Sequence, residues 1–156
     1  MRIESSKIII PEDSTNSYEA SFLADLIRYN LIERGKKLTF ETVLSHPAKI
    51  EFLKKSRDAG YKNYLYYIST EAPVINIERV RQRVKQGGHP VKESKIRSRY
   101  YNSLELLREV VKYTYRAFVF DNSGKEANLI LEVFKGDEVV FHYPEIPNWV
   151  DKYLLD

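Results

Sequence analysis

Residues 75–100 read INIERVRQRVKQGGHPVKESKIRSRY, two basic segments on either side of a glycine pair. Between positions 78 and 101 there are eight Lys or Arg and two Glu, a local charge of +6. The whole chain carries +3, so all other residues together carry −3. Pro73 suits a helix start and Gly87-Gly88 suits a break, which predicts helices over Pro73–Lys85 and Glu93–Val111.

We call residues 75–111 the basic lid. Two basic helices joined by a glycine turn suit a protein that closes over a polyanion, because guanidinium groups bind phosphate oxygens bidentately and stay charged at physiological pH. The alternative is a solvated basic helix face, with surface ion pairs such as Glu78 with Arg81. Both interpretations remain open at this stage.

Length and composition favour one domain, residues 1–156, because a chain of this length can bury a stable core without disulfides or bound metals. The chain has no Cys, which is compatible with a reducing cytoplasm. No apolar run reaches the roughly 20 residues of a membrane span, and the start lacks the pattern of a signal peptide. We therefore expect a cytoplasmic protein with no membrane partner. A pI near 8.9 is too mild to indicate nucleic acid by itself.

Strand and helix signals alternate through the middle of the chain. This predicts an α/β fold with a mostly parallel sheet, followed by a C-terminal hairpin and short helix over residues 128–156. The expected helices run from Asn16 to Gly35, from Pro47 to Gly60, over the two lid segments, and from Pro147 to Leu155. The expected strands are Lys7–Ile10, Leu38–Leu44, Tyr61–Thr70, Arg116–Asp121, Asn128–Phe134 and Glu138–Tyr143.

Three of these strands end in polar residues, at Phe40-Glu41-Thr42, Ser69-Thr70-Glu71 and Asp121-Asn122-Ser123. Ligands bind at the carboxyl ends of strands in open α/β sheets. We therefore expect the three ends to line one crevice, with the basic lid arching over it.

Short blocks along residues 17–123 resemble the zeta-toxin-like P-loop kinases of bacteria in order and spacing. The blocks are YEA (18–20), AD (24–25) with Arg28, FETV (40–43), SH (45–46), GY (60–61), YLYY (64–67), NI (76–77), RV (79–80 and 83–84), GGH (87–89), KI (95–96), RY (99–100), SL (103–104) and FDNS (120–123). The resemblance implies a nucleotide-kinase-like P-loop NTPase fold, ATP and Mg²⁺ as cofactors, and a small hydroxyl acceptor such as the nucleotide-sugar UDP-N-acetylglucosamine. It also implies an antitoxin partner. One local departure is Pro90, which precedes Val91 where the family has Pro after Val.

A second departure is the glycine-rich loop G-x-x-x-x-G-K-[ST], which the sequence does not contain. Gly-Lys pairs occur at Gly35 and Gly124, but Asn30 and Val119 stand five residues earlier instead of Gly. The loop's amides, Lys and hydroxyl hold phosphates and Mg²⁺, so binding of ATP and Mg²⁺ by this chain is in doubt. The family has a catalytic Asp shortly after that loop. No residue of this chain matches it securely, and Asp13 and Asp25 are candidates only because they are the Asp residues in this part of the sequence.

The sheet is predicted to miss or replace the strand before that loop. By resemblance that strand would lie between Leu38–Leu44 and Tyr61–Thr70, and its loss would leave unpaired backbone groups. We expect a break there, or a repair by Lys7–Ile10, by a partner chain, or by direct pairing of the neighbours. The missing N-terminal segment of the family is counted among the expected partners.

The resemblance also assigns roles to single residues. Arg79, Arg83 and Arg99 would be catalytic, stabilising charge during phosphoryl transfer, and Lys95 and Arg97 would bind nucleotide phosphates. Asp121, Asn122 and Ser123 would lie beside the nucleotide base, or form a turn unaided. Glu41 and Thr42 would lie near the substrate or a metal, or cap a strand end.

The positions of the three histidines in the sequence favour structural roles over catalytic or metal-binding ones. His89 fits a structural hydrogen bond in a glycine-rich turn, and Ser45-His46 fits a helix entry before Pro47. Histidines 46, 89 and 142 lack a paired spacing, so we expect no metal site of their own.

The first hypothesis is that the chain is the C-terminal part of a zeta-toxin-like, ATP-dependent phosphotransferase. We expect this chain by itself to be inactive. Whether the chain is an enzyme therefore stays open. The alternative is a degenerate module that binds a nucleotide or a partner without catalysis. Nucleic-acid binding is a third hypothesis, but no RRM or helix-turn-helix pattern in the sequence supports it.

Overall fold

The computed structural model describes residues 17–156. The chain divides into two units, Met1–Phe40 and Glu41–Asp156. Each unit is described by itself below. The predicted strand Lys7–Ile10, the helix start at Asn16 and the candidate Asp13 lie outside the described residues. The prediction of one domain over residues 1–156 stays a prediction.

In the first unit, the predicted helix is confirmed as α1 (Ser17–Glu33). Gly35 ends it with a φ of +65°, a conformation that glycine adopts without a steric penalty. Its amide donates to the carbonyl of Ile32 at 2.9 Å. Arg28 forms an ion pair with Asp25, and its guanidinium lies over the ring of Phe40, so the default candidate Asp25 already has a partner.

The predicted strand Leu38–Leu44 is wrong, because this segment has no regular secondary structure. Leu44 has a φ of +55°, which is incompatible with an extended strand. Its amide donates to the Thr42 hydroxyl at 3.2 Å, so a local turn replaces a sheet partner.

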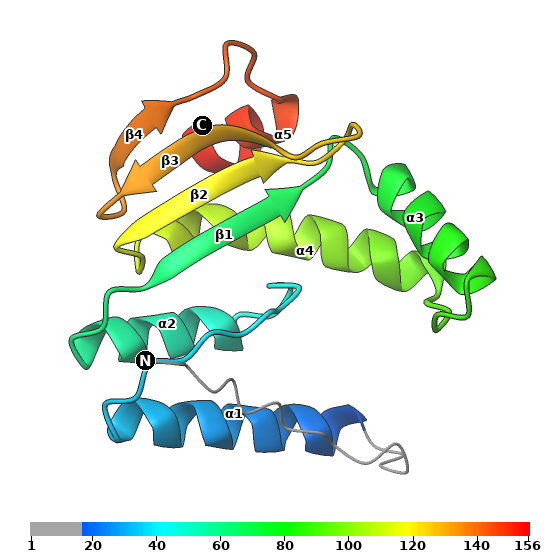
Figure 1. Ribbon diagram of the computed structural model, residues 1–156. Helices are drawn as coiled ribbons and strands as arrows, with labels where there is room; N and C mark the ends of the chain where they lie inside the picture. Colours follow the sequence, from blue (N-terminus) through cyan, green and yellow to red (C-terminus); the bar gives the residue numbers. More distant parts are fainter. Residues whose placement is uncertain (1–16) are drawn as a thin grey trace, which may run out of the picture. The chain divides into compact units, whose positions relative to one another are not determined.

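The second unit contains a four-stranded sheet in the order β1 (Tyr64–Ser69), β2 (Arg116–Asp121), β3 (Asn128–Phe134) and β4 (Glu138–Phe141). The pair β1–β2 is parallel, and the pairs β2–β3 and β3–β4 are antiparallel (Figure 1). The prediction of a mostly parallel sheet is therefore wrong, and the sheet is mixed. The cause is connection length, because the short links after β2 and β3 can only return the chain antiparallel.

The parallel pair is joined by a long crossover through α3 (Pro73–Lys85) and α4 (Glu93–Val111), which confirms both lid helices. In the described residues no strand pairs with β1 on its other side. The predicted gap beside Leu38–Leu44 does not arise in the form expected, because that segment is not a strand.

The core lies between the sheet and α4. Residues 100, 103, 104, 107, 110 and 111 of α4 are buried, the spacing of one helix face. They pack with side chains of β2 and β3. The buried residues Ala117 and Val119 alternate along β2, whereas four successive residues of β3, Ile130 to Val133, are buried.

Two further helical regions contribute side chains to the core. The chain ends in α5 (Asn148–Val150) and a π-helical turn, η1 (Asp151–Leu155), which add Trp149, Val150 and Leu154 to the core (Figure 1). The helix α2 (Ala48–Asp58) adds Ile50. Both regions were expected to be helical, over Pro147–Leu155 and from Pro47 to Gly60.

The opposite face of the sheet is aromatic and exposed. Tyr64, Tyr66 and Ile68 of β1 are 55%, 63% and 59% exposed, and the ring of Tyr66 stacks on Phe118 at 4.8 Å. No helix of the described residues is long and apolar enough to cross a membrane.

Candidate functional site

The carboxyl ends of β1 and β2 lie side by side, as the sequence predicted for two of the three strand ends. The amide of Asn122 donates to the carbonyl of Ser69 at 2.7 Å, and the amide of Glu71 donates to the Ser123 hydroxyl at 2.7 Å. The third predicted end is different, since Glu41 and Thr42 are exposed on a segment without a strand.

A pocket of about 380 Å³ opens at these strand ends. It is lined by residues from the ends of β1 and β2, from β3, and from the segment after β4: Glu71, Asp121, Ser123, Asn128, Ile130, Tyr143, Glu145, Ile146, Pro147 and Asn148. The sequence reasoning predicted Asp121 and Ser123 at this place. It did not predict that the segment after β4 also lies here. The Pro144 and Pro147 pair, which bounds a short turn before the last helix, was the available signal.

Asp121 lines this pocket, and both oxygens of its carboxylate accept hydrogen bonds. Its Oδ1 accepts from the amide of Ser123 at 2.9 Å, and its Oδ2 accepts from the Ser123 hydroxyl at 3.0 Å. The same Oδ2 accepts from the indole Nε1–H of Trp149 at 2.8 Å. Asp121 therefore joins the end of β2 to the C-terminal helix, and Trp149 is a contributor that the sequence reasoning missed.

Two buried tyrosines fix the end of β1 against α4. The Tyr100 hydroxyl donates to the carbonyls of Thr70 and Glu71 at 2.8 and 3.1 Å. Burial, and then the nearby charge of Glu71, hold the pKa of Tyr100 well above its ordinary value. Burial also raises the pKa of Tyr67, whose hydroxyl lies 3.1 Å from that of Ser103, to about 12. Both phenols thus remain neutral hydrogen-bonding groups at physiological pH.

The basic lid touches the pocket loop through one side chain. Nη2 of Arg79 donates to the carbonyl of Gly124 at 3.2 Å, directly after the Asp121–Ser123 turn. The helix α3 starts just beyond the end of β1 and, with 13 residues, is about 20 Å long. It extends away from the strands (Figure 1), so Arg83 in its last turn lies farther from them than Arg79.

Other lid cations divide into paired and unpaired groups. Arg81 forms ion pairs with Glu78 and Glu93, and the hydrogen bond to Glu93 raises the pKa of Arg81. The Glu78–Arg81 pair anticipated as the structural alternative is therefore present. The side chains of seven lid cations make no hydrogen bond or ion pair with any described residue: Arg83, Lys85, Lys92, Lys95, Arg97, Arg99 and Arg108.

Sequence comparison places the chain among known proteins. The Zeta toxin family matches residues 12–130, which is most of the chain. The chain belongs to the zeta toxin family. A stretch of 60 residues is 35% identical to an uncharacterized protein of Haemophilus influenzae (strain ATCC 51907 / DSM 11121 / KW20 / Rd). That match covers 38% of this chain and 43% of the other protein, so the chain spans less than half of that relative. No solved structure matches.

Zeta toxins are ATP-using kinases, so we tested whether the described residues fit ATP and Mg²⁺. The unpaired lid cations suit phosphate groups. No three His, Cys, Asp or Glu side chains within residues 17–156 converge as a metal would require, and the sequence has no G-x-x-x-x-G-K-[ST] loop. The lid cations have the charge and the donors that phosphate groups take, whereas the loop hydroxyl that would hold Mg²⁺ has no counterpart in the sequence.

The remaining sequence candidates have ordinary local roles. His46 Nδ1 accepts the amide of Ala48 at 3.2 Å, which fits the predicted helix entry. His142 contacts Glu132 at 3.1 Å, and His89 is exposed beside the Gly87-Gly88 turn.

Proposed function

We propose that this chain is the phosphate-gripping part of a zeta-toxin-type phosphotransferase, which moves the terminal phosphoryl group of ATP to a hydroxyl of a small acceptor. Family membership supports kinase-like chemistry in general. The acceptor, a nucleotide-sugar such as UDP-N-acetylglucosamine, and an antitoxin partner are part of the proposal. A cytoplasmic location also stays a prediction.

The observation that carries the proposal is the set of unpaired lid cations. Surface Arg and Lys side chains often find carboxylate partners, as Arg81 does here. Arg83 and Arg99 have none among the described residues, so each guanidinium has its donors available for phosphate oxygens. In this proposal Arg83 and Arg99 stabilise the charge on the transferred group, and Lys95 and Arg97 hold the neighbouring phosphates.

Arg79 and the Asp121–Ser123 turn have supporting roles in this proposal. Arg79 would hold the start of α3 against the Asp121–Ser123 turn through its bond to the carbonyl of Gly124. Asp121 shapes that loop through the three hydrogen bonds that its carboxylate accepts. Glu41 and Thr42 do not line the pocket, so their role near the substrate has only the family resemblance behind it.

The second candidate is a module that binds nucleotide or a protein partner without catalysis. The absence of the glycine-rich loop from the sequence favours it, because positioning of the phosphates depends on that loop. Under both candidates we expect this chain alone to show no ATP turnover.

Calorimetry with ATP and with inorganic triphosphate tests whether the basic lid binds phosphate groups. We expect both to bind, with affinity falling as salt rises, and we expect Arg83→Ala and Arg99→Ala each to weaken binding about tenfold. Arg34→Ala, an exposed Arg outside the lid, is the matched control and should have no effect. If neither compound binds at millimolar concentration, or if the control behaves like the lid variants, the proposal fails. ATP turnover by the chain alone that Arg83→Ala abolishes would instead refute the expected lack of catalysis.

A further inference from the structure

One edge of the sheet presents backbone groups that no described residue pairs. Among the described residues, β1 pairs with β2 alone and is an edge strand (Figure 1). The carbonyls of Asn63 and Ser69 accept amides from the residues just before and just after β2, at 2.8 and 2.7 Å. Backbone groups point to alternate sides along a strand. The residues that point their N–H and C=O groups to the free side of β1 are therefore Tyr64, Tyr66 and Ile68.

This edge lacks the features with which proteins prevent strands from pairing. The sequence of β1 is YLYYIS, with no charged residue and no Pro. The other edge strand of the described sheet, β4, has only four residues and carries Glu138. Charged residues, Pro and short length are the usual protections of an edge. Of the two edges, β1 is therefore the one suited to accept another strand.

The free side of β1 is complementary to a second copy of itself. A twofold axis perpendicular to the sheet at Tyr66 makes the two copies of β1 antiparallel and keeps their exposed faces on one side. Tyr66 then lies opposite Tyr66 of the second copy, and Tyr64 lies opposite Ile68. In this register each free N–H of one copy meets a free C=O of the other.

The side chains along the edge also suit this register. Tyr64, Tyr66 and Ile68 are all more than half exposed, and the ring of Tyr66 is held by its stacking on Phe118. The register makes one Tyr–Tyr pair and two Tyr–Ile pairs across the strands. Cross-strand pairs of aromatic and β-branched side chains stabilise a sheet, so the exposed rings would gain contacts.

The charges at the two ends of β1 are complementary as well. Lys62 precedes the strand and Glu71 follows it, and both are exposed. The antiparallel register sets Lys62 opposite Thr70 of the second copy, beside its Glu71. Opposite charges therefore meet at both ends of the paired strands, which favours this orientation.

We propose that two copies of this chain pair along β1, antiparallel and centred on Tyr66, so that the sheet continues from one copy into the other. The basic lid contributes no residue to this edge, so the inference goes beyond the proposed function and does not depend on it. A single strand edge is a small interface. We expect a weak dimer, with a dissociation constant on the order of 100 µM.

Sedimentation equilibrium of the full chain, at concentrations on both sides of this constant, tests the inference. The mass should rise with concentration from 18.4 kDa toward twice that value. Tyr66→Lys and Tyr66→Glu each set two like charges directly opposite one another, so each alone should weaken the dimer at least about tenfold. An equimolar mixture of the two variants sets Lys opposite Glu and should dimerise again.

The matched control is Val140→Lys. Val140 is 53% exposed and lies in the same row across the sheet as Tyr66, but on β4. We expect this change to leave the dimer unaffected. If it weakens the dimer as much as Tyr66→Lys does, the contact lies elsewhere and the inference is overturned.

Circular dichroism establishes that each variant keeps its fold. If the charged variants do not fold, Tyr66→Pro replaces them, because the N–H that it removes points away from β2 and the β1–β2 bonds remain. Amide exchange followed by NMR reports the register, since the amides of Tyr64, Tyr66 and Ile68 should exchange more slowly as concentration rises. A chain that stays monomeric at every concentration, a dimer that survives Tyr66→Lys, or a mixture that does not recover would each defeat the inference.

Discussion

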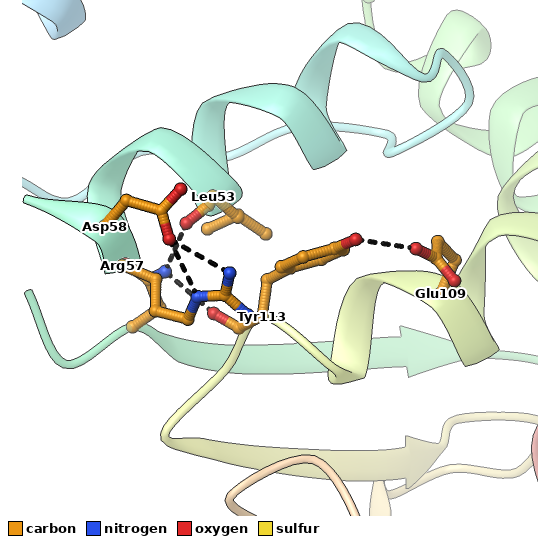
Figure 2. Close-up of polar contacts among 6 residues, drawn as sticks. Leu53, Arg57, Asp58, Glu109 and Tyr113 are labelled. Carbon is orange, nitrogen blue, oxygen red and sulfur yellow. Dashed lines mark hydrogen bonds and ion pairs between the residues drawn. The ribbon is translucent and has the colours of Figure 1, made fainter.

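At the scale of single residues, Asn63 links three elements of the second unit. It is 8% exposed, and its Nδ2 donates to the carbonyls of Leu53 and Tyr113, both at 2.8 Å. Its Oδ1 accepts from the buried hydroxyl of Ser56 at 2.7 Å. Figure 2 shows Leu53 of α2 and Tyr113, just after α4, close together at this junction. The Asn63 side chain, placed just before β1, thus satisfies groups on α2 and after α4.

We expect Asn63→Ala to lower the free energy of unfolding by about 3 kcal/mol, because buried carbonyls and a hydroxyl would lose their partners. Ser56→Ala, which removes a single bond of the network, should cost about 1 kcal/mol. Asn102→Ala makes the same chemical change at an exposed position of α4 and should stay within about 0.5 kcal/mol of the unmodified protein. Urea denaturation measures all three, and equal losses for Asn63 and Asn102 would refute the assignment.

The ring of Tyr113 adds a surface contact at the same junction. Its hydroxyl donates to Glu109 at 2.8 Å, and the guanidinium of Arg57, which also pairs with Asp58, lies 4.8 Å from the ring centre (Figure 2). Arg57 and Asp58 are exposed, so this cluster contributes little compared with Asn63.

At the scale of elements, the β3–β4 hairpin follows closely from the sequence. The strands Asn128–Phe134 and Glu138–Tyr143 were expected, and the second ends two residues early, at Phe141. Lys135 and Gly136 have φ values of +50° and +88°, the positive values that suit tight hairpin turns. Gly136 also approaches the end of α4, because a Cβ at this position would lie 3.0 Å from Cα of Lys112.

This geometry predicts that Gly136→Ala destabilises the protein by about 2 kcal/mol, through the positive φ and through the close backbone of Lys112. Gly124→Ala is the matched control, since a Cβ at Gly124 would meet no atom within 4 Å and its φ is not positive. We expect the control to change stability by less than about 0.5 kcal/mol. Thermal unfolding of the two variants compares them directly, and similar melting temperatures would contradict the close approach.

At the scale of the whole molecule, the core belongs to the second unit. Every residue of the buried core cluster lies between Leu44 and Leu154, and the sheet uses residues 64–141. Because hydrophobic burial is the main stabilising contribution to folding, residues 41–156 hold the interactions that a stable fold requires.

We therefore expect a fragment of residues 41–156 to fold without residues 1–40. It should show a cooperative urea transition and dispersed amide signals in a proton–nitrogen NMR spectrum. Val110→Asp in the same fragment is the control, because a charge at a fully buried core position should abolish the transition. A fragment that is unfolded before the control change is made would show that residues 1–40 are required for the fold.

The sequence by itself determined the helices, most of the strands, the hairpin turn and the family. These depend on local signals: Pro73 and Gly87 at the helix ends, the spacing of apolar residues in α4, and the glycine after Lys135. It also brought the ends of β1 and β2 together, because residues at the carboxyl ends of parallel strands share one edge.

Only the tertiary structure decided the direction of β3 against β2, the loss of the strand at Leu38–Leu44, and the return of the segment Tyr143–Asn148 to the pocket. It also showed that Asp121 binds Trp149, 28 positions later in the chain. Pairing partners and buried hydrogen bonds join residues far apart in sequence, and their free energy exists only when the chain has folded. Local propensity therefore places the elements, and long-range contacts determine which side chains form the site.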